Sequence, residues 1–251
     1  MIIVFLLRNL LAQIIMFILI SILTIVSYFY SFISTRDQML KILTLGFIYI
    51  RKIIFFIMGI TLEYRGLDNL LNTPCIIASK HQSSLESSFF FNEFFLRTLY
   101  AFKKEIAYVP MWGRINMKCG GLKIDRSKGI KILDAFVADG KKYISLGYNV
   151  AIFPEGTRTP VEVKNGKFKM GVARLYKECN VPIIPVALNS GICYPKGSWL
   201  IYSGHIIVEF LKPIYPGMEE KKMLLHLQEI VNARSNELAE ESLGRKKKKF
   251  S

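Results

Sequence analysis

The sequence predicts an α/β protein that carries an apolar helical segment at its N-terminus. The first 60 residues are strongly apolar and include an uncharged run at 10–33. From residue 61 onward, short apolar runs alternate with stretches of helical periodicity, which is typical of strands and helices packed in layers. We therefore divide the chain into a membrane anchor at 1–60, an α/β domain at 61–244 and a basic tail at 245–251.

The composition excludes a disordered chain and favours contact with a membrane. Of the 251 residues, 51% are hydrophobic and 13% aromatic, whereas disordered chains are poor in both. The net charge is +15, and the mean hydropathy is +0.31. The cysteines contain no Cys-x-x-Cys pair, so we expect reduced thiols that pack as small apolar side chains: Cys75, Cys119, Cys179 and Cys193.

The uncharged run at 10–33 is long enough to cross a membrane. Its 24 residues would form a helix of about 36 Å, against a hydrocarbon core of about 30 Å. A cleaved signal peptide fits less well, because the run is too long and no Ala-x-Ala site follows it. We expect a retained transmembrane helix.

A second apolar stretch, at 42–60, has Arg51 and Lys52 at its middle. Because a charge at the bilayer centre costs about 2.5–3.5 kcal/mol, we expect an interfacial or re-entrant helix with both basic groups at headgroup level. Basic residues are also more frequent after the first span than before it, where only Arg8 stands. This bias predicts that the remaining chain lies on the cytoplasmic side of the inner membrane.

The domain shows the alternation of strands and helices most clearly from residue 74 onward. Apolar runs bounded by turn residues predict the strands, and apolar residues at helical spacing predict the helices. The predicted elements are a strand at 74–79, a helix at 83–100, a helix at 126–146, a strand at 150–153, a helix at 170–178, strands at 181–188 and 205–211, and a helix at 218–243.

Of the three histidines, His81 stands where a predicted strand ends and a helix begins, with Glu86 five residues later. On one continuous helix these two side chains would point about 140° apart. If His81 lies in the preceding turn, the carboxylate can reach the ring, fix its tautomer and stabilise the imidazolium. The alternative is a surface histidine near a helix start.

Two further segments could bind an anion. In the first, residues 153–158, Gly156 permits close approach of the backbone and Arg158 offers a planar guanidinium for phosphate. In the second, Lys123 precedes and Arg126 opens a predicted helix, so its first N–H groups and the Arg126 guanidinium could bind one anion. The alternatives are a strand-end turn with a solvated arginine, and an ordinary helix cap.

Together these segments resemble the 1-acylglycerol-3-phosphate acyltransferases, a phospholipid-synthesis branch of the glycerolipid acyltransferases. Residues 81–86 are similar to that family's His-x4-Asp box, with Glu86 in place of the usual aspartate, and residues 153–158 match its FPEGTR motif in full. The resemblance spans about residues 61–190 and implies a mixed sheet flanked by helices. Further matches are Lys104, Pro110, Gly113, Gly120, Asp125 and Arg126, and the segments 168–171 and 181–186.

The resemblance implies an acyltransferase of EC class 2.3.1. It would move a fatty acyl group from acyl-CoA or acyl carrier protein to the sn-2 hydroxyl of 1-acyl-sn-glycerol-3-phosphate (lysophosphatidic acid), which gives phosphatidic acid. His81 would act as general base, Glu86 would orient it, and backbone N–H groups at the helix start would hold the oxyanion. Transfer would be direct, with no cofactor and no metal. The residues implied in binding the acceptor are Lys123, Arg126, Glu155, Gly156, Thr157 and Arg158.

Two alternatives stay open at this point. The acceptor could be glycerol-3-phosphate or another lysophospholipid. Alternatively, the chain could be a membrane-tethered module that holds anionic lipid or nucleic acid by its charge, whereas the enzyme interpretation expects membrane lipid and no nucleic acid. A serine hydrolase of the G-x-S-x-G type and a P-loop enzyme are excluded, because the sequence contains neither motif.

Overall fold

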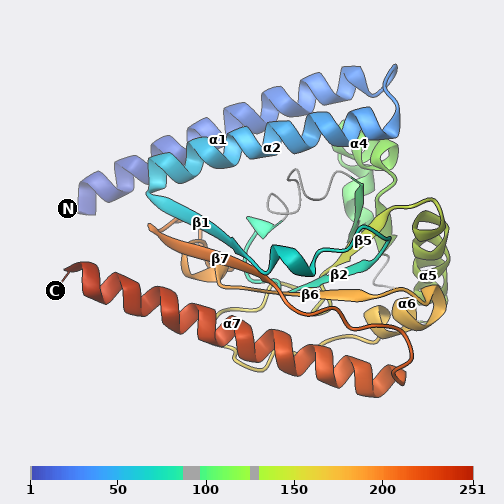
Figure 1. Ribbon diagram of the computed structural model, residues 1–251. Coiled ribbons are helices and arrows are strands. Elements are labelled where there is room, and N and C mark those ends of the chain that lie inside the picture. Colours follow the sequence, from blue (N-terminus) through green and yellow to red (C-terminus); the bar gives the residue numbers. More distant parts are fainter. Residues whose placement is uncertain (1, 87–96, 125–129, 251) are drawn as a thin grey trace.

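The computed structural model describes residues 2–86, 97–124 and 130–250 (Figure 1). Within these ranges, seven strands form a sheet in the order β1-β7-β6-β2-β5-β3-β4. Neighbouring strands run parallel except β6 and β7, which are antiparallel, so the sheet is mixed and the predicted fold class is confirmed. The strands are β1 (Ile60–Arg65), β2 (Ile76–Ser79), β3 (Thr98–Lys103), β4 (Leu122–Ile124), β5 (Asn149–Ile152), β6 (Ile183–Leu188) and β7 (Gly204–Phe210).

Helices cover both faces of this sheet. On one face lie α5 (Ile130–Ser145), α6 (Gly171–Cys179) and α7 (Glu220–Phe250), and on the other lie α1 (Ile2–Tyr30) and α2 (Arg36–Met58) (Figure 1). The short helix α4 (Trp112–Cys119) packs against α2.

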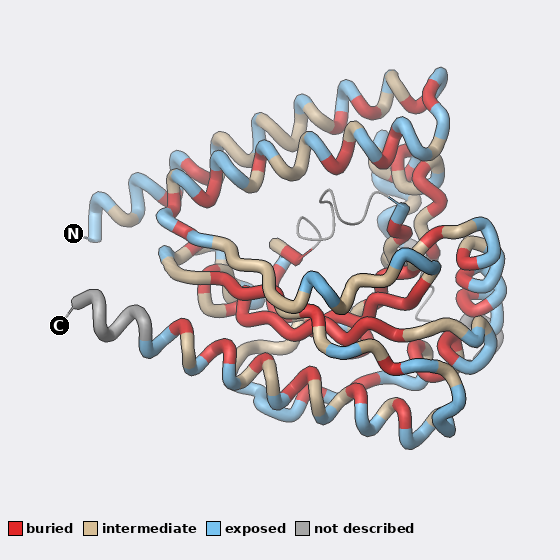
Figure 2. Tube along the Cα trace, in the orientation of Figure 1, coloured by how far each residue is buried: buried red, intermediate tan, exposed pale blue. Residues whose placement is uncertain are grey.

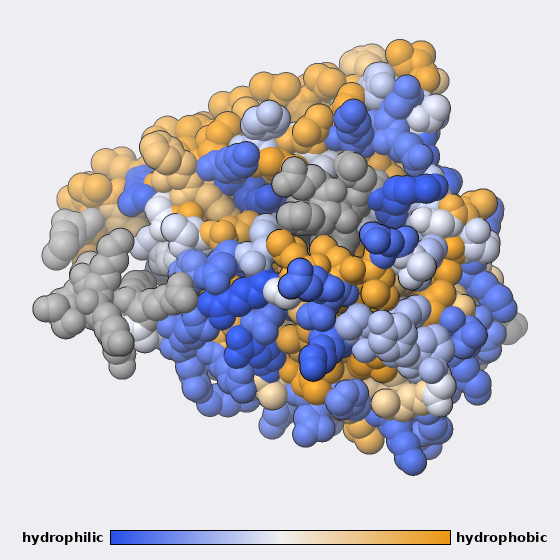
Figure 3. All heavy atoms as spheres, viewed as in Figure 1, coloured by the Kyte–Doolittle hydropathy of each residue, from blue (hydrophilic) through white to orange (hydrophobic). Residues whose placement is uncertain are grey.

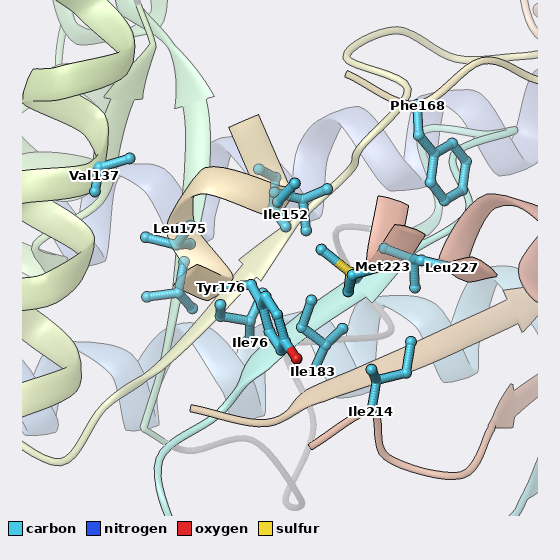
Figure 4. Packing of buried hydrophobic residues seen from close by; sticks show 14 of the residues in the cluster. Ile76, Val137, Ile152, Phe168, Leu175, Tyr176, Ile183, Ile214, Met223 and Leu227 are labelled. Carbon is cyan, nitrogen blue, oxygen red and sulfur yellow. The ribbon is translucent and has the colours of Figure 1, made fainter. Parts of the chain in front are cut away.

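The central strand β2 is buried on both faces. Ile76 packs against Tyr176 of α6 and Met223 of α7 (Figure 4), whereas Ile77 belongs to the cluster that contains Met58 of α2. A strand covered on both sides reads as a continuous apolar run. This is why the sequence predicts a strand here without any alternation of apolar and polar residues.

The first two helices form an antiparallel hairpin. Thr35 caps α2 through a reciprocal pair of bonds with Gln38, and Gly59 ends α2 in the left-handed conformation. Helix α2 continues through Arg51 and Lys52 and begins at Arg36, earlier than the predicted stretch. The outer side of the hairpin is exposed and apolar (Figures 2 and 3). Within the described residues, α1 is the one helix long and apolar enough to cross a membrane.

Helix α1 is also bonded to the domain near both of its ends. The Asn9 amide donates to the carbonyl of Ile201 and accepts from its N–H, at 3.1 and 2.7 Å. Near the other end, Arg114 of α4 donates to the hydroxyl of Ser31 at 2.8 Å. The hairpin therefore lies along the domain instead of projecting from it.

The structure differs from the sequence prediction in several elements. Residues 98–100 belong to β3, not to the end of a helix at 83–100; residues 87–96 of that prediction lie outside the described residues. Helix α7 extends to Phe250, so residues 245–250 of the predicted tail continue a helix. Strands β1 and β4 and helix α4 were not predicted. Short apolar runs carry too little periodicity to distinguish a strand from a helix. Here β3 forms a strand because it pairs with β5.

The cysteines are free thiols, as predicted. Cys75, Cys119 and Cys193 are buried, and Cys179 is half-buried. Burial raises the pKa of Cys75 and of Cys119 to about 12, so both thiols stay protonated at neutral pH and pack as apolar groups.

Gly66 in the turn after β1 offers a test of this packing. Its φ is +67°, and a Cβ there would lie 2.1 Å from the carbonyl oxygen of Phe210. We expect Gly66→Ala to lower the free energy of unfolding by more than the roughly 1–2 kcal/mol of the left-handed backbone alone, measured by thermal denaturation. Gly197→Ala is the matched control, because Gly197 has φ +80° and no atom within 4 Å of a built Cβ. Equal losses in both variants would contradict the close approach.

Candidate active site

The candidate site lies where the carboxyl ends of β2, β5 and β6 meet. These three strands are parallel neighbours, so the residues that follow them gather at one edge of the sheet. His81 follows β2, residues 153–158 follow β5, and Ser190 follows β6. The fold thus brings together segments separated by up to about a hundred residues of sequence.

The predicted pair of His81 and Glu86 is formed. The His81 Nδ1 atom lies 2.5 Å from Glu86 Oε2, and the Glu86 side chain is completely buried. Its second oxygen, Oε1, accepts from the backbone N–H groups of Gln82 and Ser83, at 3.1 and 2.7 Å, and from the hydroxyl of Ser190. These donors fix the carboxylate in one orientation under the imidazole.

The contact to Glu86 determines what His81 can do chemically. A carboxylate accepts hydrogen bonds, so the Nδ1 proton donates to Glu86 and the ring's lone pair lies on Nε2. Nε2 has no hydrogen-bond partner within the described residues, and the side chain is 19% exposed. His81 therefore presents a proton acceptor at the surface of the site.

The segment after β5 contacts both the face of the His81 ring and the His81 backbone. The Phe153 ring stacks on the imidazole, with 4.0 Å between ring centroids and 15° between planes. The His81 N–H donates to Glu155 Oε2 at 2.8 Å, and the His81 carbonyl accepts from the Thr159 N–H at 2.6 Å. Ring and backbone are thus positioned by the same short stretch of chain.

Glu155 does not lie where a substrate could contact it. Its side chain is 1% exposed, and Oε1 accepts from the ammonium of Lys80 at 2.6 Å. Both carboxylate oxygens are used inside the protein, and the part of Glu155 in shaping the acceptor site stays a prediction.

Other residues of the FPEGTR motif face outward. Gly156 adopts φ +66°, Thr157 is exposed and Arg158 is half-buried. Within the described parts of the chain, Arg158 has no hydrogen bond or ion pair, and its neighbour Thr159 contacts the His81 backbone. An acceptor-binding role for Gly156, Thr157 and Arg158 stays a prediction.

The second predicted anion-binding segment is only partly described. Lys123 lies in β4, but its side chain and the whole of Arg126 lie outside the described residues. Strand β4 is parallel to β3, and β3 to β5, so Ile124 ends at the same edge of the sheet as β2 and β5.

The predicted oxyanion donors at the helix start are not free. The N–H groups of Gln82 and Ser83 donate to Glu86, and that of Leu85 donates to the Ser83 hydroxyl at 3.1 Å. These three amides are therefore bonded within the protein, and the oxyanion role of backbone N–H groups stays a prediction. Among the described residues there is also no cluster of histidine, cysteine and carboxylate side chains that could hold a metal.

Sequence reasoning missed four residues that support the site. Gln82 accepts from the Gly191 N–H at 3.1 Å, Ser190 donates to Glu86, and the buried Lys80 donates both to Glu155 and to Asn232. Of these four, only Lys80 could have been recognised in the sequence, because a charged residue at the end of a buried strand needs a partner.

Comparison with known proteins shows the family to which the chain belongs. Residues 61–189, more than half of the chain, match the family described as Acyltransferase. The chain belongs to this family, and the family membership inferred from the motifs is confirmed.

Individual relatives are similar over part of their length. A "1-acyl-sn-glycerol-3-phosphate acyltransferase" of Pseudomonas aeruginosa is 40% identical over 150 residues, which cover 60% of this chain and 58% of that protein. A protein of the same name from Saccharomyces cerevisiae is 28% identical over 159 residues, or 62% and 52%. The chain thus spans between about half and three fifths of these relatives.

A solved structure shares the fold. The crystal structure of the "1-acyl-sn-glycerophosphate (LPA) acyltransferase, PlsC" from Thermotoga maritima superposes with a TM-score of 0.74. The superposition covers 92% of this chain and 96% of that chain, at 20% sequence identity. The likeness supports the architecture described above.

The hydroxyl of Ser190 tests how the carboxylate under His81 is held. Ser190→Ala removes one donor from the buried Glu86, and hydrogen bonds to charged groups contribute about 1.5–3 kcal/mol. We expect a loss of that order in the free energy of unfolding, measured by denaturation in detergent. Ser198→Ala is the control, because the Ser198 hydroxyl bonds only within its own loop. A loss no larger than in the control would show that Ser190 is dispensable.

Proposed function

We propose that this chain transfers a fatty acyl group to the sn-2 hydroxyl of 1-acyl-sn-glycerol-3-phosphate and so forms phosphatidic acid. The observation that carries the proposal is the His81–Glu86 pair, which leaves Nε2 as a proton acceptor beside the motif that contains Arg158. The relatives named above carry this activity in their names. The donor is acyl-CoA or acyl carrier protein, and no cofactor or metal takes part.

The geometry supports a direct transfer. His81 Nε2 takes the proton of the acceptor hydroxyl as its oxygen attacks the thioester carbonyl. Glu86 stabilises the imidazolium that results. The tetrahedral intermediate then expels the thiolate, which receives the proton from His81, so an ester and a free thiol are the products. Arg158 binds the phosphate of the acceptor through charge-assisted hydrogen bonds.

We propose that the α1/α2 hairpin attaches the chain to the membrane lengthwise, within one leaflet. If α1 crossed the bilayer, its bonds to Ile201 and Arg114 would have to break, or the domain would have to follow it into the hydrocarbon. The apolar outer side of α1 suits burial at the interface. This arrangement replaces the transmembrane span expected at 10–33. We place the domain on the cytoplasmic side of the inner membrane, because both thioester donors are cytoplasmic.

The central test of the proposed function is an assay of the detergent-solubilised chain with lysophosphatidic acid and each donor. His81→Ala removes the general base, and we expect kcat to fall by about 10²–10⁴-fold. His226→Ala is the matched control, because His226 is exposed on α7. Wild-type activity in the His81 variant would refute the catalytic role. Binding of lipid without any acyl transfer by the wild-type chain would instead favour a tethered binding module.

Arg158 tests the phosphate-binding part of the proposal. Arg158→Ala should raise the KM for lysophosphatidic acid about tenfold or more, with a smaller effect on the KM of the donor, because a charge-assisted bond is lost. Arg174→Ala is the control, since Arg174 pairs with Asp134 on the surface of α6. An unchanged acceptor KM would remove Arg158 from phosphate binding. Glycerol-3-phosphate and other lysophospholipids in the same assay identify the preferred acceptor.

A further inference from the structure

Lys80 is a charged side chain in the interior, only 2% exposed. Ile76 and Ala78 of β2 point toward the cluster that α6 and α7 cover, and alternation continues this row to Lys80. His81, one residue later, turns to the opposite side. A lysine in such a place is costly unless its charge is paired and its donors are satisfied.

The partners of Lys80 form a continuous chain of bonds from α7 to His81. The Lys80 ammonium donates to Glu155 Oε1 and to Asn232 Oδ1 of α7, each at 2.6 Å. The Asn232 amide donates in turn to the carbonyl of Gly166 at 2.9 Å. The other oxygen of Glu155 accepts the His81 N–H. One carboxylate therefore joins the buried lysine to the backbone of the proposed base.

We propose that Lys80 is a positioning residue for His81, acting through Glu155, and that Asn232 makes α7 part of the active-site scaffold. The inference rests on the proposed acyl transfer. Lys80 touches no substrate; its charge fixes the orientation of Glu155, so that Oε2 meets the His81 N–H. This backbone bond and the contact of Glu86 with Nδ1 together set the direction in which the Nε2 of His81 points.

The protein is tightly packed around Lys80 and Glu155. A Cβ built on Gly166 would lie 2.3 Å from Glu155 Oε1 and 2.8 Å from Lys80 Nζ, so the backbone is packed directly against both groups. If the ammonium is removed, Glu155 becomes a buried and uncompensated carboxylate that must turn, protonate or draw in water. A carboxylate that turns or draws in water no longer holds the His81 N–H, so the His81 backbone is released. Displacement of a catalytic group by about 1 Å can cost about 10²-fold in rate.

The test compares Lys80→Met with the double variant Lys80→Met/Glu155→Gln in the full chain. We expect the single variant to lose about 10²-fold in kcat per folded molecule, with the KM for lysophosphatidic acid unchanged. The double variant should recover at least about tenfold, because glutamine keeps an oxygen for the His81 N–H and removes the unpaired charge. Arg234→Met is the control: it also removes a charge from α7 but breaks only the ion pairs with Glu209 of β7 and Glu237 of α7, not the bonds among Lys80, Glu155 and Asn232, and should keep kcat.

Several outcomes would overturn the proposal. Wild-type kcat in folded Lys80→Met would do so, as would a double variant no faster than the single one. If Lys80→Met does not fold, Asn232→Ala decides, because both charges stay in place; a loss of about tenfold in kcat at constant KM is expected, and wild-type kcat would refute the link to α7. A wild-type chain without acyl transfer would refute the proposed function itself, which is a separate result.

Discussion

The buried carboxylate of Glu86 is the constraint on which the site depends. Its two oxygens accept hydrogen bonds from the imidazole of His81, from two backbone N–H groups and from the hydroxyl of Ser190. These bonds connect the end of β2 to the end of β6. Glutamate stands where the family pattern has aspartate, and its side chain is longer by one methylene group. The 2.5 Å contact to His81 Nδ1 shows that the longer side chain still reaches the ring.

The FPEGTR motif has two sides that act differently. Phe153, Glu155 and Thr159, just beyond the motif, hold the ring and the backbone of His81. Thr157 is exposed, and the half-buried Arg158 has no hydrogen bond or ion pair within the described residues. In the proposed function, one short motif thus has two tasks: it positions the base and binds the phosphate of the acceptor.

The hairpin shows why an apolar run does not by itself determine how a chain meets a membrane. Helix α1 is long enough to cross a bilayer, yet polar side chains on its inner side bond to the domain. Asn9 and Gln13 are minor features of the hydropathy pattern. Their bonds to Ile201 and Trp199 nevertheless orient the helix along the domain, with its apolar side outward.

The sequence alone determined the α/β class and most strands after residue 74, because these depend on local periodicity. It offered the pairing of His81 with Glu86 as one of two possibilities, because their spacing allows contact only if His81 lies in a turn. It did not determine strands β1, β3 and β4, the inward turn of Glu155, or the partners Lys80, Ser190 and Asn232. The bonds of Lys80 to Glu155 and Asn232 join residues that are 75 and 152 positions apart, and strands β1, β3 and β4 form by pairing with other strands. Only the tertiary structure brings such segments together, since sheet order and helix packing decide which side chains share the interior.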